Sequence, residues 1–219
     1  MRPKRKGIYL MAAGILLILA AIVILLNNIR EEKQAAVSAL QAVEQLWEEI
    51  PVSDAGQELP SNAQEASGTA PADMNEVEIP DYILNPEMEM PEVRIDGWDY
   101  IGILEIPGLD LSLPVISQWR YPALKMAPCR YLGSAYTNDL IIAAHNYSSH
   151  FGRLKTLAAG SLINFTDVDG NFFTYRVVLV ETLLPTDVEE MESGGWDLSL
   201  FTCTPGGQYR VTVRCERAE

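Results

Sequence analysis

Residues 198–215 read LSLFTCTPGGQYRVTVRC, two runs of alternating apolar and polar side chains on either side of a Pro-Gly-Gly turn. This alternation is typical of β-strands, and the turn between the runs predicts an antiparallel hairpin in which Cys203 faces Arg210. A period of two then divides the hairpin into two faces. The polar face carries Ser199, Phe201, Cys203, Arg210, Thr212 and Arg214, and the apolar face, predicted to be core, carries Leu198, Leu200, Val211, Val213 and Cys215.

The same strand-like pattern extends over residues 93–219, which are numerous enough for one hydrophobic core. Gly, Pro, Asn and Asp punctuate the pattern, as they do between strands. The predicted strands are 100–106, 111–116, 139–144, 171–181, 197–202 and 209–215, with one short helix near 151–159. We therefore predict a mostly β domain, either a barrel or a sandwich, of which a closed barrel would leave no strand edge exposed.

An apolar run without charges, residues 8–26, follows the basic segment 1–7. A helix of this length spans roughly 28 Å, close to the ~30 Å hydrocarbon core of a bilayer. Basic residues on the short flank predict a cytoplasmic N-terminus, with the β domain outside the cell. A cleaved signal peptide is the alternative, but its apolar region is usually only about 7–15 residues long. We expect an uncleaved, single-pass anchor in the cell membrane.

Two further segments separate this anchor from the β domain. Residues 27–50 have the apolar spacing of an amphipathic helix, interpreted as a marginal membrane-proximal helix with nothing to pack on; a stalk or a dimerising helix is the alternative. Residues 51–92 are acidic and rich in Pro, Ala and Ser, which predicts a disordered tether that holds the β domain away from the membrane. Within the tether, 82–84 and 88–90 are apolar enough to dock on the domain as a partial lid.

The net charge of −14 is unevenly distributed along the chain. Residues 34–92 contain thirteen acidic and no basic side chains, whereas 93–219 carry only −5. An acidic chain argues against a nucleic-acid partner, because phosphates require a basic surface. The glycine patterns of dinucleotide and nucleoside triphosphate sites are also missing from the sequence.

Three cysteines, an odd number in an exported domain, leave at least one thiol free or intermolecular. Cys203 ends a strand beside Arg210, and a neighbouring cation favours the reactive thiolate, so Cys203 is the predicted nucleophile. Cys215 belongs to the apolar face and is predicted to be buried. A disulfide between Cys129 and Cys215 is the alternative for those two residues.

The chain has only two histidines, and they differ in context. His145 follows the predicted strand 139–144, and a histidine at a strand end is well placed for acid–base chemistry with a neighbouring strand. His150 lies in a polar loop and is expected to be solvated. The cysteines and histidines lack metal-ligand spacing, so we predict no metal site.

Several of these stretches together resemble the sortases. The resemblance rests on the run 143–146 (AAHN), the run 199–203 (SLFTC) and Arg210 at the start of the next strand. The family signature is TLxTC, followed by that arginine and preceded by a histidine; here Ser199 replaces the first Thr, and His145 lies 58 residues before Cys203. The run 100–115 (YIGILEIPGLDLSLPV) is similar to the opening strands of sortase domains.

This resemblance implies a closed eight-stranded sortase-type β-barrel with one or two short helices, and a cysteine transpeptidase of the Gram-positive cell wall. Cys203 would attack an LPxTG-like sorting signal of an exported protein and form a thioester. His145 would protonate the leaving amine and then deprotonate the incoming one, from a peptidoglycan precursor or a pilin. Arg210 would stabilise the oxyanion or hold the signal, and Ala144 and Thr202 would line the groove. No cofactor is implied.

Departures from the family pattern bear on the subclass and on the alternatives. The stretch between Val180 and Trp196 is too short for the long inserted helix of class B. The Asp-Pro-aromatic lid motif of many class C members is missing, and no membrane helix follows Arg217. This favours a housekeeping-like or class D-like enzyme, and a pilin polymerase without that lid is the alternative. Arg214 is interpreted as a surface side chain. The alternatives are an L,D-transpeptidase or another exported Cys-His hydrolase, and a non-catalytic wall-binding β-barrel.

Overall fold

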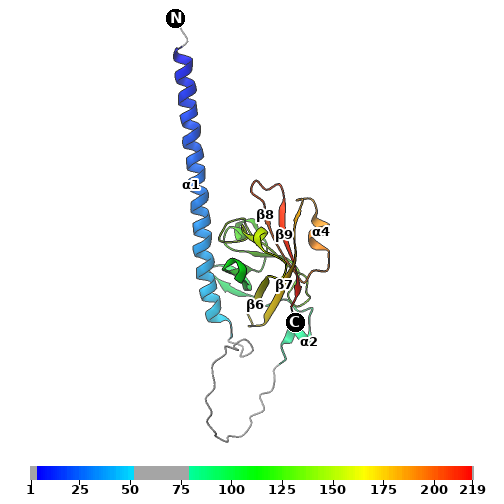
Figure 1. Ribbon diagram of the computed structural model, residues 1–219. Coiled ribbons are helices and arrows are strands. Elements are labelled where there is room, and N and C mark those ends of the chain that lie inside the picture. Colours follow the sequence, from blue (N-terminus) through cyan, green and yellow to red (C-terminus); the bar gives the residue numbers. More distant parts are fainter. Residues whose placement is uncertain (1–3, 52–78, 219) are drawn as a thin grey trace, which may run out of the picture.

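The computed structural model describes residues 4–51 and 79–218 of the chain. One long helix, α1 (Lys4–Glu49), lies alongside a β domain, and its N-terminal part extends beyond that domain (Figure 1). The predicted anchor and the predicted amphipathic helix are therefore one continuous helix. The predicted disorder of 51–92 falls mainly on residues 52–78, which lie outside the described residues.

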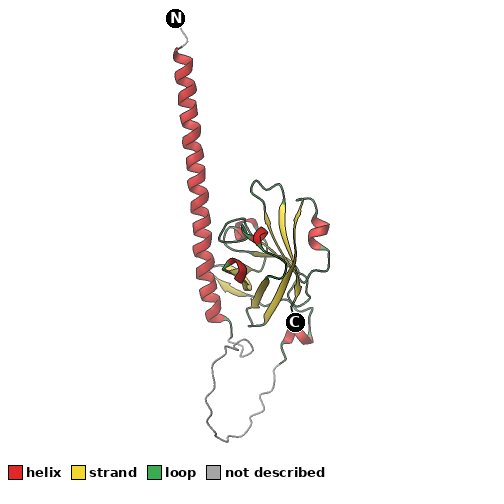
Figure 2. Ribbon diagram, viewed as in Figure 1, coloured by secondary structure: helices red, strands yellow, loops and turns green. Residues whose placement is uncertain are grey.

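The β domain is a closed eight-stranded barrel with one additional strand (Figure 2). Around the barrel the strands pair in the order β2-β3-β4-β5-β8-β9-β7-β6, and β6 pairs with β2 to close it. The additional strand, β1, forms a hairpin with β2. The predicted closed, mostly β barrel is confirmed. The strands are β1 (Val93–Ile95), β2 (Trp98–Ile106), β3 (Leu111–Ile116), β4 (Cys129–Leu132), β5 (Leu140–Ala143), β6 (Leu162–Asp167), β7 (Phe172–Leu183), β8 (Leu198–Cys203) and β9 (Arg210–Arg217).

The six strands predicted from the sequence are β2, β3, β5, β7, β8 and β9, each within two residues at either end. Three further strands, β1, β4 and β6, were not predicted; they are three, four and six residues long. The short helical elements are α2 (Asp81–Leu84), α3 (Tyr121–Leu124), α4 (Val188–Glu192) and two 3₁₀ turns, η2 (Pro107–Leu109) and η3 (Leu154–Thr156).

The predicted helix at 151–159 is wrong, because only the single turn η3 forms there. Phe151, Leu154 and Leu157 are buried in the main core cluster, which is the larger of two groups of buried apolar side chains in the domain. Their three-residue spacing matches a 3₁₀ turn, which aligns side chains at i and i+3. The apolar pattern was therefore correct in marking core residues and wrong about the backbone.

The backbone requires a glycine at position 102, where β2 pairs with both β3 and β6. Its φ is +154°, and a Cβ at this position would lie 2.1 Å from the carbonyl oxygen of Thr166. Only glycine allows the backbones to approach so closely.

The C-terminal half of α1 packs against the barrel, contrary to the interpretation that it has nothing to pack on. Ala35, Ala39, Ala42, Leu46 and Ile50 recur at helical spacing and are all buried. Ala39 joins the main core cluster, and the others from Ala42 onward join a second cluster with side chains of β1, β2 and β3. The alanines let the two backbones come close, so α1 is an integral part of the folded domain.

The end of the predicted tether also docks on the barrel. The ring of Tyr82 in α2 stacks on Tyr136 at a centroid distance of 4.8 Å, and Met88 and Met90 pack against the main core. This contact lies near the start of β7, at Phe173, whereas the other end of β7 pairs with Arg210. Residues 79–92 are therefore ordered, and they cover the barrel end opposite Cys203 instead of forming a lid over it.

Candidate active site

The hairpin of β8 and β9 has the predicted register. Cys203 pairs with Arg210 and Ser199 pairs with Arg214 in the antiparallel ladder. The side chains predicted to face inward, Leu198, Leu200, Val211, Val213 and Cys215, all lie in the main core cluster. Cys203 and Arg210 therefore stand side by side at the open end of the hairpin, both partly exposed.

Parallel pairing of β5 with β8 brings His145 to the same barrel end. Ala143 pairs with Phe201, and the backbone N–H of Ala144 donates to the carbonyl of Phe201 at 3.2 Å. Continued by two residues, this register places His145 level with Cys203. The topology thus gathers all three predicted catalytic side chains, which lie up to 65 residues apart in the sequence.

His145 is half-buried between two tyrosines. Its ring meets Tyr121 edge-on at 5.9 Å and lies 5.0 Å from the ring of Tyr147. Its Nε2 is buried and has no hydrogen-bond partner among the described residues. Burial lowers the pKa of His145, the charge of Lys125 lowers it further, and Glu31 of α1 partly opposes both effects. A neutral imidazole is therefore favoured at neutral pH, as a proton acceptor requires.

His150 is fully buried, which corrects the expectation that it is solvated. The loop after His145 folds inward: the backbone N–H of Phe151 donates to the carbonyl of His145 at 3.2 Å, and the ring of His150 lies 5.5 Å from that of Tyr147. Both ring nitrogens of His150 lack a hydrogen-bond partner among the described residues. Burial, reinforced by His145, lowers the pKa of His150 to about 4.

This burial predicts an acid-sensitive fold. Between about pH 6.5 and pH 4 the unfolded chain binds a proton at His150 that the folded chain excludes, so the free energy of unfolding falls as the pH falls. We expect His150 to cost about 3 kcal/mol of stability between pH 7 and pH 4. Urea unfolding of the full chain in micelles, followed by tryptophan fluorescence, should show this loss in the wild type and not in His150→Phe. Parallel pH profiles for the two proteins would contradict the assignment.

Arg210 has a guanidinium without an ion pair among the described residues. Its Nη1 donates to the carbonyl oxygens of Gly207 at 3.1 Å and Tyr209 at 3.2 Å, both in its own loop. These bonds hold the side chain at the mouth of the hairpin while leaving its charge uncompensated. The remaining N–H groups can therefore bind an anionic or carbonyl oxygen next to Cys203.

Arg214 is buried, not a surface side chain as predicted; only 2% of its surface is exposed. Its guanidinium pairs with Glu181 at 2.8 Å and donates to Ser199 Oγ at 2.9 Å. It also donates to the carbonyls of Met191 at 3.0 Å and Glu190 at 2.5 Å. Through these hydrogen bonds Arg214 holds α4, which lies in the connection between β7 and β8, against the outer face of the β8–β9 hairpin. The sequence could not indicate that Arg214 is buried, because the residues that cover it belong to a separate segment of the chain.

Arg214→Ala is expected to destabilise the barrel by about 3 kcal/mol, because it leaves the Met191 carbonyl and the Ser199 hydroxyl buried without a donor and Glu181 without its ion pair. Arg176 is exposed on β7, so Arg176→Ala is the matched control and should change stability by less than about 0.5 kcal/mol. Chemical denaturation of the full chain in micelles measures both. Equal stability of the two variants would show that the cover is held by other contacts.

Ala144 and Thr202, the predicted groove residues, are both buried. The hydroxyl of Thr202 donates to the carbonyl of Ala144 at 2.8 Å, which ties the end of β8 to the residue before His145. Their contact with a substrate remains a prediction. The hydrogen bond gives them a structural contribution, since it fixes the spacing between the cysteine strand and the histidine loop.

All three cysteines are free, so the alternative disulfide between Cys129 and Cys215 does not form. Cys129 and Cys215 are fully buried, and burial raises the pKa of each thiol to about 12. Cys203 is the exposed member of the three. Within residues 4–51 and 79–218 no cluster of His, Cys, Asp and Glu could hold a metal ion.

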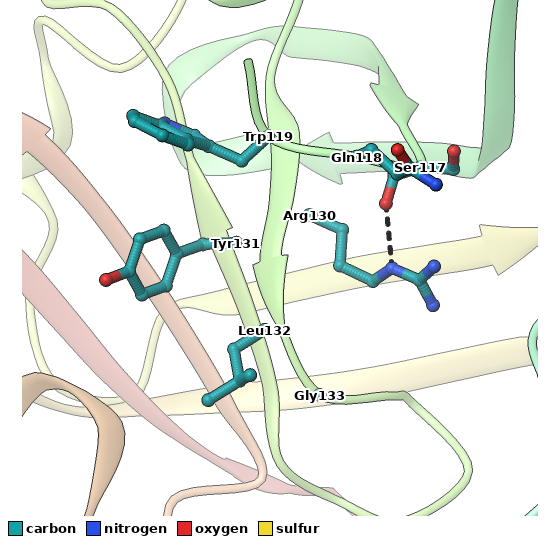
Figure 3. Close-up of a pocket in the computed structure, with 7 residues that line it drawn as sticks. All are labelled: Ser117, Gln118, Trp119, Arg130, Tyr131, Leu132 and Gly133. Atoms are coloured by element: carbon teal, nitrogen blue, oxygen red, sulfur yellow. Dashed lines mark hydrogen bonds between the residues drawn. The ribbon is translucent and has the colours of Figure 1, made fainter.

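A pocket lies on the outer face of the barrel near this site (Figure 3). Trp119, Tyr131 and Leu132 project to one side of it, while Arg130 turns away and donates through Nε to the carbonyl of Ser117 at 2.9 Å. The ring of Tyr131 meets Trp119 at 6.1 Å. On its other side it meets Phe201, two residues before Cys203, at 5.3 Å. An aromatic surface therefore leads from the pocket to the thiol. The pocket is lined by Ser117, Gln118, Trp119, Arg130, Tyr131, Leu132 and Gly133.

Comparison with known families agrees with this arrangement. The family description "Sortase domain" matches residues 104–218, which is more than half of the chain. The chain belongs to the sortase family. Members of this family are cysteine transpeptidases, and the match includes β8, β9 and the loop that carries His145. No curated protein sequence matches the chain.

Solved sortase structures share the fold. Clostridium perfringens sortase C, solved with the C-terminal cell wall sorting motif, superposes with a TM-score of 0.50 at 22% identity, covering 59% of this chain and 74% of that one. Sortase C1 of GBS pilus island 1 has a TM-score of 0.49 at 21% identity, covering 55% of this chain and 64% of that one. Sortase A from Corynebacterium diphtheriae (a lid mutant) has a TM-score of 0.49 at 21% identity, covering 63% and 75%. At these identities the likeness concerns the fold alone.

Proposed function

We propose that this sortase-family protein is a membrane-anchored transpeptidase that cleaves an LPxTG-like sorting signal and joins the exported protein to an amine. The observation that carries the proposal is the convergence of Cys203, His145 and Arg210 at one barrel end. The acceptor is an amine of a peptidoglycan precursor or of a pilin lysine, in a Gram-positive cell wall.

In the first half-reaction His145, neutral at rest, accepts the proton of the Cys203 thiol, and the resulting thiolate attacks the carbonyl carbon of the scissile amide. Arg210 donates to the oxygen that becomes negative, and such donors stabilise the transition state most when they are preorganised. Collapse of the adduct breaks the C–N bond and leaves the acyl group on Cys203 as a thioester. The departing nitrogen takes its proton from the imidazolium of His145.

In the second half-reaction the incoming amine replaces the leaving group. His145, now neutral, accepts a proton from this amine as its nitrogen attacks the thioester carbonyl. The new amide forms, the Cys203 thiolate departs, and His145 returns its proton to this thiolate. His145 therefore donates a proton to the leaving amine and accepts one from the incoming amine. Its Nε2 has no hydrogen-bond partner among the described residues, which suits this exchange of protons.

The aromatic surface from Phe201 to Tyr131 and Trp119 is our candidate groove for the apolar part of the sorting signal. It lies on the outer face, the same face as Cys203 and Arg210, as period-two alternation requires. We propose in addition that residues 8–26 of α1 span the cell membrane with the N-terminus cytoplasmic. This part of α1 is long and apolar enough to cross a bilayer, and none of it is buried against the barrel.

Intact mass spectrometry tests the chemistry. The full chain in lipid nanodiscs is incubated with a panel of LPxTG-type peptides that differ at each position. We expect a mass gain equal to the peptide minus its leaving fragment, reversed by hydroxylamine, as a thioester requires. The transpeptidase proposal fails if no peptide yields an adduct while circular dichroism shows the folded barrel.

A further inference from the structure

The anchor helix contacts the loop that carries the catalytic histidine. The Oε1 atom of Glu32 accepts hydrogen bonds from the backbone N–H of Ser148, at 2.8 Å, and from its hydroxyl. One residue earlier, Glu31 pairs with Lys125 at 3.7 Å, and both charges act on His145. Positions 31 and 32 of α1 therefore lie level with the catalytic end of the barrel.

This level is close to the end of the apolar segment. Glu31 lies five residues beyond Leu26. At ~1.5 Å per residue this is a rise of about 7–8 Å along the helix. The headgroup layer on each side of the ~30 Å hydrocarbon core is itself about 5–8 Å thick. A helix that spans the bilayer with residues 8–26 therefore carries Glu31 at the outer limit of the headgroups.

The barrel cannot drift away from this level, because α1 is fixed to it over several turns. Buried contacts extend from Ala35 to Ile50, and the contacts of Glu31 and Glu32 continue them toward the membrane. In Figure 1 the loop between β8 and β9 points the same way as the N-terminal end of α1. The residues between 52 and 78 therefore do not set the distance between the barrel and the membrane.

The side chains at this end have the character of a membrane interface. Tyr121 is 64% exposed beside His145, and Tyr147 lies on the other side of the imidazole. Arg120 and Lys125 flank Tyr121 and are also exposed. Tyrosine, with an apolar ring and a polar hydroxyl, is enriched at the level of the headgroups, and basic side chains reach toward lipid phosphates.

We propose that α1 and the barrel form one rigid unit that holds the His145 end of the barrel against the lipid headgroups, with Tyr121 in contact with the bilayer. The partner of this surface is the membrane that α1 itself crosses. The proposal rests on the proposed membrane span. Its consequence is a substrate preference: the site acts on sorting signals held at the membrane surface in preference to the same signals free in solution.

Fluorescence quenching by spin-labelled lipids tests the contact. In a Cys203→Ala background, an introduced cysteine at Tyr121, Ile18 or Phe172 is labelled with an environment-sensitive dye. The full chain is placed in nanodiscs that contain lipid spin-labelled either at the headgroup, for positions 121 and 172, or deep in the acyl chain, for position 18. Phe172 is the matched control, because it is exposed on β7 at roughly 35 Å along the strand from the end that pairs with Arg210. We expect the acyl-chain label to quench position 18 and the headgroup label to quench position 121 but not position 172.

The outcomes separate this proposal from the one it rests on. Quenching at 18 without quenching at 121 overturns the headgroup contact and leaves the anchored transpeptidase standing. No quenching at 18 shows that α1 does not span the membrane, which overturns both the anchor and the contact. Equal quenching at 121 and 172 indicates a freely tumbling barrel and also overturns the contact.

A spacer variant tests the substrate preference. Eleven helix-forming residues inserted between Asn28 and Ile29 make three turns, so they move the barrel about 16 Å outward with little rotation and leave every barrel contact intact. We expect quenching at 121 to disappear and the rate on a membrane-anchored substrate to fall at least tenfold, while the rate on a soluble peptide is unchanged. Equal rates on the anchored substrate for the wild type and the spacer variant would overturn the preference.

Discussion

Cys203→Ala is expected to abolish both thioester formation and amide transfer, lowering the rate by about 10⁴-fold or more, as removal of a covalent nucleophile does in other hydrolases. No second thiol can replace it, because Cys129 and Cys215 are fully buried and burial raises the pKa of each to about 12. The measurement is the release of a fluorescent leaving fragment from a sorting-signal peptide by the full chain in nanodiscs. Residual activity should not exceed that of the uncatalysed peptide.

Cys129→Ala and Cys215→Ala are the matched controls, since each removes one thiol and leaves Cys203 in place. Both should keep activity within about twofold of the wild type wherever the barrel remains folded, because a buried thiol acts as a small apolar side chain. Iodoacetamide should modify Cys203 alone in the native protein. Full activity in Cys203→Ala would refute the assignment of the nucleophile.

Arg210→Ala is expected to reduce kcat by about 10²–10³-fold, the usual loss when one donor to a developing oxyanion is removed. The guanidinium is available for this because it has no ion pair among the described residues and contacts only the carbonyls of Gly207 and Tyr209 in its own loop. Arg210→Lys retains the charge but not the forked donor geometry, so it should recover only part of the rate.

The kinetic constants distinguish the two roles left open for Arg210. A fall in kcat at unchanged KM indicates stabilisation of the oxyanion, whereas a rise in KM at unchanged kcat indicates that Arg210 holds the sorting signal. Arg176→Ala, at an exposed position of β7, controls for the loss of one positive charge and should change neither constant. Unaltered kinetics in Arg210→Ala would remove this residue from the site.

The prediction of Cys203, His145 and Arg210 as site residues depended in part on local sequence patterns, which the folded structure retains. Alternation within β8 and β9 placed Cys203 and Arg210 on the polar face, because a strand has only two faces, and the pairing of these two residues was expected from the hairpin turn. His145 was singled out by its position at the end of an apolar strand. Its neighbours Tyr121 and Tyr147 were not, since nothing in their local sequence marks them as partners of an imidazole.

Burial of polar side chains was the least predictable feature. Arg214 and His150 both read as solvent-exposed from their own segments, yet both are enclosed. Arg214 is covered by α4, which belongs to the connection between β7 and β8, and His150 is turned inward by the loop that follows His145. The segments that bury these two side chains reach their positions only when the whole barrel has formed.

The closed barrel and the catalytic role of His145 were expected only from the resemblance to the sortases. By itself, the sequence determined the apolar helix near the N-terminus, a mostly β domain and the two faces of the hairpin that carries Cys203 and Arg210. These follow from composition and from periodicities of two and 3.6 residues, which act over short distances along the chain. Only the tertiary structure decided that Ala35 to Ile50 of α1 pack on the barrel and that Glu32 holds the loop of His145. A helix pattern shows which face is apolar but not what covers it. The position of the His145 loop relative to α1 therefore depends on long-range packing, which is complete only when the barrel has formed.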